Sequence, residues 1–316
     1  MFLDTLLFTL GVTAPLLLWI ALGFFMRWSG ILSTIWIQRG SWSMFYIFLP
    51  LLMFISMVRK PLDQALDPLL VTLCFITTYA IYRFARFLSE QKQLQWSRAT
   101  VYQQGALRGN LGIIGVSLCL NAYGREALLD ISLLMAVLAV FYNIISTLIF
   151  VRNRADAEEK NRRHWLLSLL SNPLIAASLA GLLVNLSPLN MPEPWLDQGL
   201  KWIQYSFPLA LVCVGGSLSL KGLASSALLA RDIALLKLVI MPTLAVCLLL
   251  LAGYQGQTLG MVFLLTASPV ATASFVMARG YGADAEFAAN VVVTTTLLGL
   301  LSLSLGVFLL RLLNLM

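Results

Sequence analysis

Charged residues are scarce in this chain. Only 11% of its 316 residues are Asp, Glu, Lys or Arg, whereas 59% are hydrophobic, and the mean hydropathy is +0.87. A soluble domain has about 25% charged residues, and no soluble core could bury so much apolar surface. The composition therefore excludes an ordinary soluble protein and indicates a membrane protein.

Histidines and closely spaced cysteines, which supply many catalytic and metal-binding side chains, are also nearly missing. His164 is the single histidine, and it lies in the most charged linker of the chain. The four cysteines lie in apolar runs without CxxC spacing, so neither a disulfide framework nor a zinc site is expected. We predict that the protein is not an enzyme and that it uses no metal and no cofactor.

Acidic residues are lacking in the middle of every apolar run. Asp130, Asp284 and Glu286 all lie near the ends of such runs. Cation antiporters normally use buried carboxylates that alternate between an ion and a proton. The sequence therefore argues against a cation exchanger, and it leaves sodium coupling through neutral oxygen atoms open.

Ten apolar runs follow one another along the chain, and a membrane helix needs ~20 mostly apolar residues. The first run is expected to be a membrane span rather than a signal peptide, because Asp4 replaces the basic region of such a signal. The sequence predicts an all-α polytopic membrane protein with ten transmembrane helices, near residues 5–25, 41–57, 67–87, 99–121, 128–151, 166–186, 199–218, 232–253, 258–279 and 287–312.

Lysine and arginine are concentrated in alternate loops between these runs. The odd-numbered loops hold fourteen of them and the even-numbered loops hold four. Because positive residues are retained on the cytoplasmic side, we expect a multi-pass protein of the cell inner membrane with both termini outside. The net charge of +7 is spread over these short loops, so the expected partner is membrane lipid and not nucleic acid.

The two halves of the chain match at a shift of 158 residues. This shift places Pro15 on Pro173 and Gly23 on Gly181, and it aligns each of the first five runs with a run in the second half. Because five spans is an odd number, the second copy must be inverted, as in many secondary transporters. We predict a first repeat over residues 1–151, a cytoplasmic linker over 152–165 and a second, inverted repeat over 166–316.

Two of the matching runs contain poor helix formers. Residues 105–115 include four glycines and Arg108, whose charge costs at least ~2.5 kcal/mol at membrane depth. Residues 266–274 include Pro269, which lacks a backbone donor. Matching interruptions in two halves are the best sequence indication of a midplane binding site, where half-helix N-termini attract an anion.

In that site Arg108 would favour negative charge, and Asn110, Ser268, Thr272 and Ser274 would add hydrogen bonds. Two alternatives stay open, since the glycines could serve helix packing and Arg108 could extend to the cytoplasmic interface. Lys237, another cation within an apolar run, is expected to pair with Asp232 or to extend to the interface rather than to line the path of the anion.

Five segments together resemble the auxin efflux carrier family of membrane transport proteins, over essentially the whole chain. These segments are residues 108–115 (RGNLGIIG), 172–175 (NPLI), 208–211 (PLAL) with 215–218 (GGSL), 268–278 (SPVATASFVMA) and 281–282 (YG). Leu111 stands where plant members would have a second proline, and the neighbouring glycines are expected to supply the flexibility instead.

The resemblance implies a scaffold of helices 1, 2, 6 and 7, usually forming a homodimer, and a mobile transport domain of helices 3–5 and 8–10. It also implies that helices 4 and 9 are broken at a crossover, beside which a small organic anion binds. Malonate and malate are examples of the dicarboxylates carried by bacterial relatives, and an elevator-type movement is expected. The predicted substrate site comprises Arg108, Asn110, Leu111, Gly112, Ser268, Pro269, Thr272 and Ser274.

Two other functions are compatible with the sequence. A sodium-coupled organic-anion symporter of the bile-acid type would share the crossover, and sodium-dependent binding would distinguish it. A membrane receptor or sensor of a small acid would use the same helices to detect a ligand rather than to move it.

Overall fold

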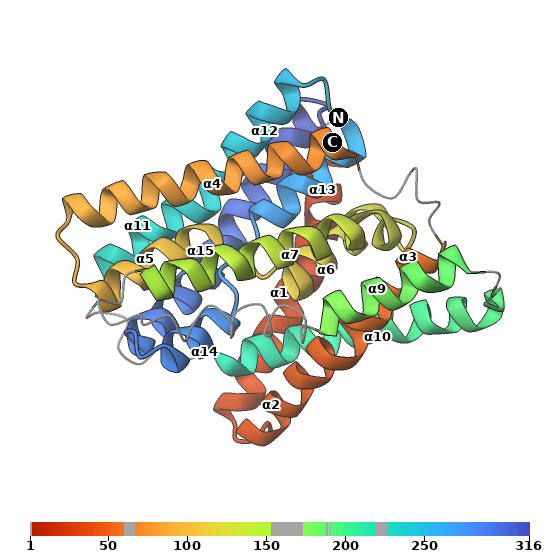
Figure 1. Ribbon diagram of the computed structural model, residues 1–316, viewed down its shortest axis with the longest axis horizontal. Helices are drawn as coiled ribbons and strands as arrows, with labels where there is room; N and C mark the ends of the chain where they lie inside the picture. Colours follow the sequence, from red (N-terminus) through yellow and green to blue (C-terminus); the bar gives the residue numbers. More distant parts are fainter. Residues whose placement is uncertain (1, 60–66, 153–172, 188, 190, 219–225) are drawn as a thin grey trace.

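The computed structural model describes residues 2–59, 67–152, 173–187, 189, 191–218 and 226–316, and these residues form an all-helical protein (Figure 1). Within these ranges the structure has no β-strand, only one isolated β-bridge. The first half contains α1 (Phe2–Trp28), α2 (Thr34–Ser43), the π-helical turn η1 (Met44–Phe48), α3 (Leu49–Arg59), α4 (Pro68–Gln91), α5 (Trp96–Leu107), the π-helical turn η3 (Leu111–Gly115), α6 (Val116–Tyr123) and α7 (Ala127–Arg152).

The second half contains α9 (Pro173–Leu186), α10 (Glu193–Ser217), α11 (Ala227–Leu235), the π-helical turn η5 (Leu236–Ile240), α12 (Met241–Leu251), α13 (Gly256–Thr266), α14 (Ala273–Gly280) and α15 (Ala285–Leu312). The start of the predicted sixth span and nearly all of the predicted linker over 152–165 lie outside the described residues.

Six helical segments are long and apolar enough to cross a membrane: Phe2–Trp28, Thr34–Arg59, Pro68–Gln91, Ala127–Phe150, Ala227–Leu251 and Ala285–Leu312. Large apolar side chains lie on the outer faces of these segments, such as Leu18 and Leu301, and also on α9, such as Leu183, each more than 65% exposed. A soluble protein rarely exposes such a surface. The structure thus confirms a polytopic membrane protein, whereas the number of ten spans stays a prediction.

The helices pack in two groups, which Figure 1 shows mostly in the lower right and in the left and upper parts of the view. In one group α10 packs against α1, α2 and α3, and α3 packs against α9. In the other, α15 packs against α11 and α14, and α12 packs against α4 and α13. The second group also includes α5, which packs against α4 and α11, α6, which packs against α13, and α7, which packs against α4 and α5. Contacts of α1 with α6 and α15, and of α3 with α7, join the two groups.

Glycines allow the helices of the first group to approach closely. A Cβ atom on Gly23 would overlap the Val212 carbonyl of α10, and one on Gly215 would overlap the Ile20 carbonyl of α1. In the pair formed by α3 and α9, a Cβ atom on Gly181 would lie 2.6 Å from the Phe54 carbonyl oxygen. Backbone-to-backbone contact of this kind is the usual role of small residues in membrane helix packing.

We predict that Gly23→Ala lowers the thermal stability of the detergent-purified protein, because the added methyl group meets a backbone that cannot rotate away. Overpacking of this kind costs ~1–3 kcal/mol. Gly11→Ala, in the same helix, is the matched control, since a Cβ atom there meets nothing within 4 Å. Thermal unfolding should separate the two variants, and equal melting temperatures would show that α1 and α10 can separate at no cost.

Candidate functional site

The first interruption separates α5 from η3. The last helical amide of α5 is that of Arg108, which donates to the Gln104 carbonyl at 2.9 Å. The backbone then leaves the helical conformation, with a ψ angle of 99° at Arg108, which is extended, and of 65° at Asn110. Asn110 starts the next helix as its N-cap, because its side-chain oxygen accepts from the Ile113 amide at 3.4 Å.

The second interruption separates α13 from α14. Pro269 has no amide hydrogen, and the Ser268 hydroxyl donates to the Leu265 carbonyl that a helical residue 269 would have served. The Val270 amide donates to the Thr295 hydroxyl of α15 at 3.2 Å rather than to its helical acceptor, the Thr266 carbonyl. The carbonyl of Thr266 is therefore free for another donor.

The two interrupted segments cross each other. The Asn110 amide donates to the Pro269 carbonyl at 2.7 Å, and the Ala271 amide donates to the Arg108 carbonyl at 3.3 Å. Gly109 and Val270 form the isolated antiparallel bridge between them. The structure thus has both interruptions where the sequence predicts them, and the peptide groups at each break bond to those at the other.

Lys237 of η5 lies at this crossover, contrary to the expectation that it pairs with Asp232 or extends to the interface. Its side chain is fully buried, and its Nζ donates to the free Thr266 carbonyl at 2.7 Å. Asp232 instead pairs with Lys92, with 2.9 Å between Nζ and Oδ2. The prediction was wrong because the carbonyl left free at the second interruption offers Lys237 a partner inside the protein.

A cavity of about 1280 Å³ lies beside the crossover, between the two groups of helices. Its lining comes from α1, α2, η1 and α10 on one side and from the crossover, α7 and α14 on the other. Among the described residues that line it are Arg27 and Arg108, and none of these residues is Asp or Glu. The lining is therefore positive, with a surface that is otherwise apolar, aromatic or neutral.

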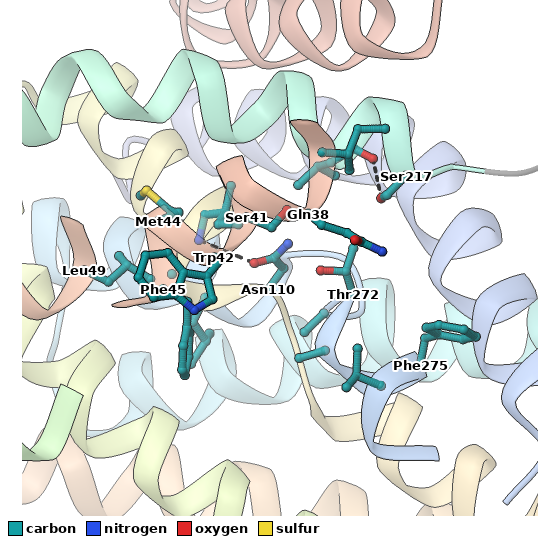
Figure 2. A pocket seen from close by; sticks show the side chains of 18 of the residues that line it. Gln38, Ser41, Trp42, Met44, Phe45, Leu49, Asn110, Ser217, Thr272 and Phe275 are labelled. Carbon is teal, nitrogen blue, oxygen red and sulfur yellow. Dashed lines mark hydrogen bonds between the residues drawn. The ribbon is translucent and has the colours of Figure 1, made fainter. Parts of the chain in front are cut away.

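The Asn110 side chain occupies a central place in the view of this cavity, between Trp42 and Thr272 (Figure 2). Its oxygen serves the N-cap, so its Nδ2 group is left for another acceptor. This Nδ2 is buried, and among the described residues it has no hydrogen-bond partner. A buried donor without a partner at a cavity wall is suited to a ligand acceptor atom.

The residues predicted for the substrate site fall into two sets. Those that line the cavity are Arg108, Asn110, Leu111, Gly112 and Thr272. Those that do not are Ser268, Pro269 and Ser274. The first two of this second set build the crossover itself, whereas the Ser274 hydroxyl is buried in α14 without a partner among the described residues. Their part in binding stays a prediction.

Sequence reasoning missed the contribution of α2 to the cavity. Gln38, Ser41 and Trp42 line it, and Figure 2 shows them around Asn110. The predicted second span began at residue 41, because the polar residues before it lower the hydropathy. The helix instead begins at Thr34, after the N-cap Ser33. The polar residues directly before the apolar run were the feature of the sequence that could have indicated a cavity wall.

A substitution of Thr295 tests how strongly the stability of the second interruption depends on its hydrogen bond to α15. We predict that Thr295→Val lowers stability by ~1–3 kcal/mol, because it leaves the buried Val270 amide without an acceptor. Thr296→Val is the matched control, since the Thr296 hydroxyl bonds to the Val292 carbonyl of its own helix. Thermal unfolding of both variants measures the difference, and an equal loss in both would contradict this role.

Two comparisons with known proteins gave matches over most of the chain. A family model described as "Membrane transport protein" matches residues 9–307. The chain is also similar to a protein of Rhizobium meliloti (strain 1021) named "Putative malonate transporter", with 26% identity over 276 residues that cover 84% of each chain.

Proposed function

Because this chain belongs to the membrane transport protein family, which includes the auxin efflux carriers and their bacterial relatives, we propose that it is a secondary transporter for a small organic anion. The observation that carries the proposal is Asn110 at the crossover, which lies in the cavity wall and whose buried Nδ2 has no hydrogen-bond partner among the described residues. The described residues of the lining include two arginines and no carboxylate. Such a lining attracts an anion, because it has positive charges and no negative charge that would repel a carboxylate.

The helix ends add to this positive field. The segment beginning at Leu111 and the helix α14 beginning at Ala273 both start at the cavity wall. The first amides of a helix have no intrahelical acceptor, and its N-terminus carries about half a positive charge. A carboxylate bound beside Asn110 and Thr272 would accept hydrogen bonds from such amides and lie near the Arg108 guanidinium.

A dicarboxylate is the substrate class that we infer. Arg108 and Arg27 belong to different groups of helices and line the same cavity, so one carboxylate could meet each cation. The Rhizobium relative, whose name refers to malonate, supports this class. We propose that the cargo is a short dicarboxylate of the malonate type.

We further propose that the two halves are inverted repeats. Gly23 packs on Val212, and Gly181 packs on Phe54. The two glycines differ by 158 positions, and so do the two residues that they contact. Gly124 and Gly282, which also match at this shift, both have positive φ angles, of 78° and 74°. The matching contacts of Gly23 and Gly181 and the matching backbone angles of Gly124 and Gly282 support this proposal.

Alternating access would follow from a movement of one group of helices against the other. The cavity lies at the C-terminal end of α10, which we expect on the cytoplasmic side because positive residues are concentrated in the loops of that side. At the other end of α10 the Arg125 guanidinium, between α6 and α7, bonds to the Asp197 carboxylate at 3.2 Å and to its carbonyl at 2.9 Å. We infer that this contact closes the outer end while the cavity faces the cytoplasm, as an elevator mechanism requires.

The binding site is tested with malonate and the purified protein. Arg108→Gln and Asn110→Ala should each weaken malonate binding by about 10- to 100-fold, because each removes a hydrogen bond to a charged ligand worth ~1.5–3 kcal/mol. Arg231→Gln is the control, since this exposed arginine does not line the cavity. Titration calorimetry gives the affinities, and unchanged binding in both site variants would refute the site.

The closure of the outer end is tested by labelling. Ala273→Cys in a Cys247→Ser background places an exposed thiol at the cavity wall, while the other native cysteines are buried. Adding Arg125→Gln should slow labelling from the cytoplasmic side of inside-out vesicles, because it weakens the closed outer end.

The control for this experiment is Arg59→Gln. Arg59 also pairs with Asp197, at 3.0 Å, but it belongs to α3, which packs in the same group as α10. Its loss should leave the labelling rate unchanged. Equal labelling of the Arg125 variant and the parent would contradict a role for this contact in access.

A further inference from the structure

The side chain of Lys237 is a buried cation for which the transport mechanism proposed above has no use. It is 0% exposed, and among the described residues no carboxylate lies within ion-pair distance of its Nζ. Its contacts are the Thr266 carbonyl oxygen at 2.7 Å and the Met241 sulfur at 3.4 Å. A lysine at membrane depth without a counter-charge is costly, so its position requires a compensating partner.

Gly109 places the ammonium group between the two interrupted segments. A Cβ atom on Gly109 would lie 2.9 Å from the Lys237 Nζ and would overlap the Ser268 hydroxyl oxygen. Any side chain at residue 109 would therefore displace Lys237 or the second interruption. The absence of a side chain here lets one cation contact both halves of the crossover.

Two helix C-termini supply the compensation. α5 ends at Leu107 and α13 ends at Thr266, and both ends lie at the crossover beside Lys237. Each helix C-terminus carries about half a negative charge and unpaired carbonyl oxygens. The crossover thus separates charge, with two negative helix ends at the lysine and two positive helix starts at the cavity.

Free carbonyl oxygens at broken membrane helices are typical ligands of sodium ions in coupled transporters. We propose that the ammonium group of Lys237 occupies this position permanently, as a built-in substitute for a coupling cation. The protein then needs no inorganic cation to hold the crossover together or to bind its anion. The part that concerns the anion rests on the proposed function, whereas the cation position does not.

The first test compares wild type with Lys237→Ala in the absence of any organic anion. Wild type should have the same melting temperature in sodium chloride and in choline chloride at equal ionic strength. Lys237→Ala should melt at a lower temperature in choline, and sodium or methylammonium should restore part of the loss by entering the vacated space. Lys237→Met should be destabilised without restoration, because its side chain still fills that space.

The second test measures malonate affinity in the same salts. Wild type should bind equally well with sodium and with choline. Lys237→Ala in choline should bind at least tenfold more weakly and should recover in sodium or methylammonium. Lys92→Met is the control, because Lys92 is a partly exposed cation paired with Asp232, and its affinity should equal that of wild type.

Three results would overturn the proposal: sodium-dependent malonate binding by wild type, wild-type affinity in Lys237→Met, or no cation response in a folded Lys237→Ala. Sodium-dependent malonate binding by wild type overturns the proposal even if the variants do not fold. A cation-dependent melting temperature in Lys237→Ala, together with no binding of malonate or any other acid by wild type, would support the cation position and refute the proposed function.

Discussion

The structure depends on one constraint, which is that peptide groups released inside a membrane must find partners within the protein. Two helices are interrupted here, and each interruption leaves carbonyl and amide groups without helical partners. The segments satisfy each other through the Asn110 amide and the Pro269 carbonyl, and through the Ala271 amide and the Arg108 carbonyl. Thr295 and Lys237 satisfy two of the remaining groups, the Val270 amide and the Thr266 carbonyl. Each break is therefore stable only in the presence of the other and of its neighbours in α15 and η5.

The pairing of the two interrupted segments also fixes where positive and negative helix ends lie. Helix starts and helix ends cannot exchange places at a crossover, because the chain direction fixes which end of each half-helix faces which side. The starts of η3 and α14 line the cavity, and the ends of α5 and α13 lie near Lys237. An anion and a cation can therefore occupy neighbouring positions on opposite sides of the crossover without contact between them. The backbone direction thus adds to the positive field that Arg27 and Arg108 give the cavity.

Sequence reasoning located the interruptions, because glycines, a proline and a charge within apolar runs are local features. It also named Arg108 and Asn110 as substrate-binding residues because they are the polar groups at the break; both line the cavity, and their part in binding stays a prediction. It failed for Lys237 because hydropathy cannot tell a lysine that reaches the interface from one that meets a free carbonyl, which depends on η5 lying beside α13. It also missed Gln38 and Ser41, whose exposure to a cavity looks the same as exposure to water in a hydropathy profile. Residues that interrupt a helix can be identified from the sequence, whereas contacts between groups far apart in the sequence cannot.

A fixed ammonium at the crossover has a consequence for energetics under the proposed mechanism. An inorganic cation can bind on one side of the membrane and leave on the other, so its gradient can drive the movement of an anion. Lys237 cannot leave, and its neighbours in α5, α11, α12 and α15 pack around η5 as parts of one group of helices. The lysine charge would therefore travel with the moving group in both directions, whether the anion is bound or absent. Each cycle then returns that charge to its starting side, and the net work comes from the gradient and the charge of the organic anion itself.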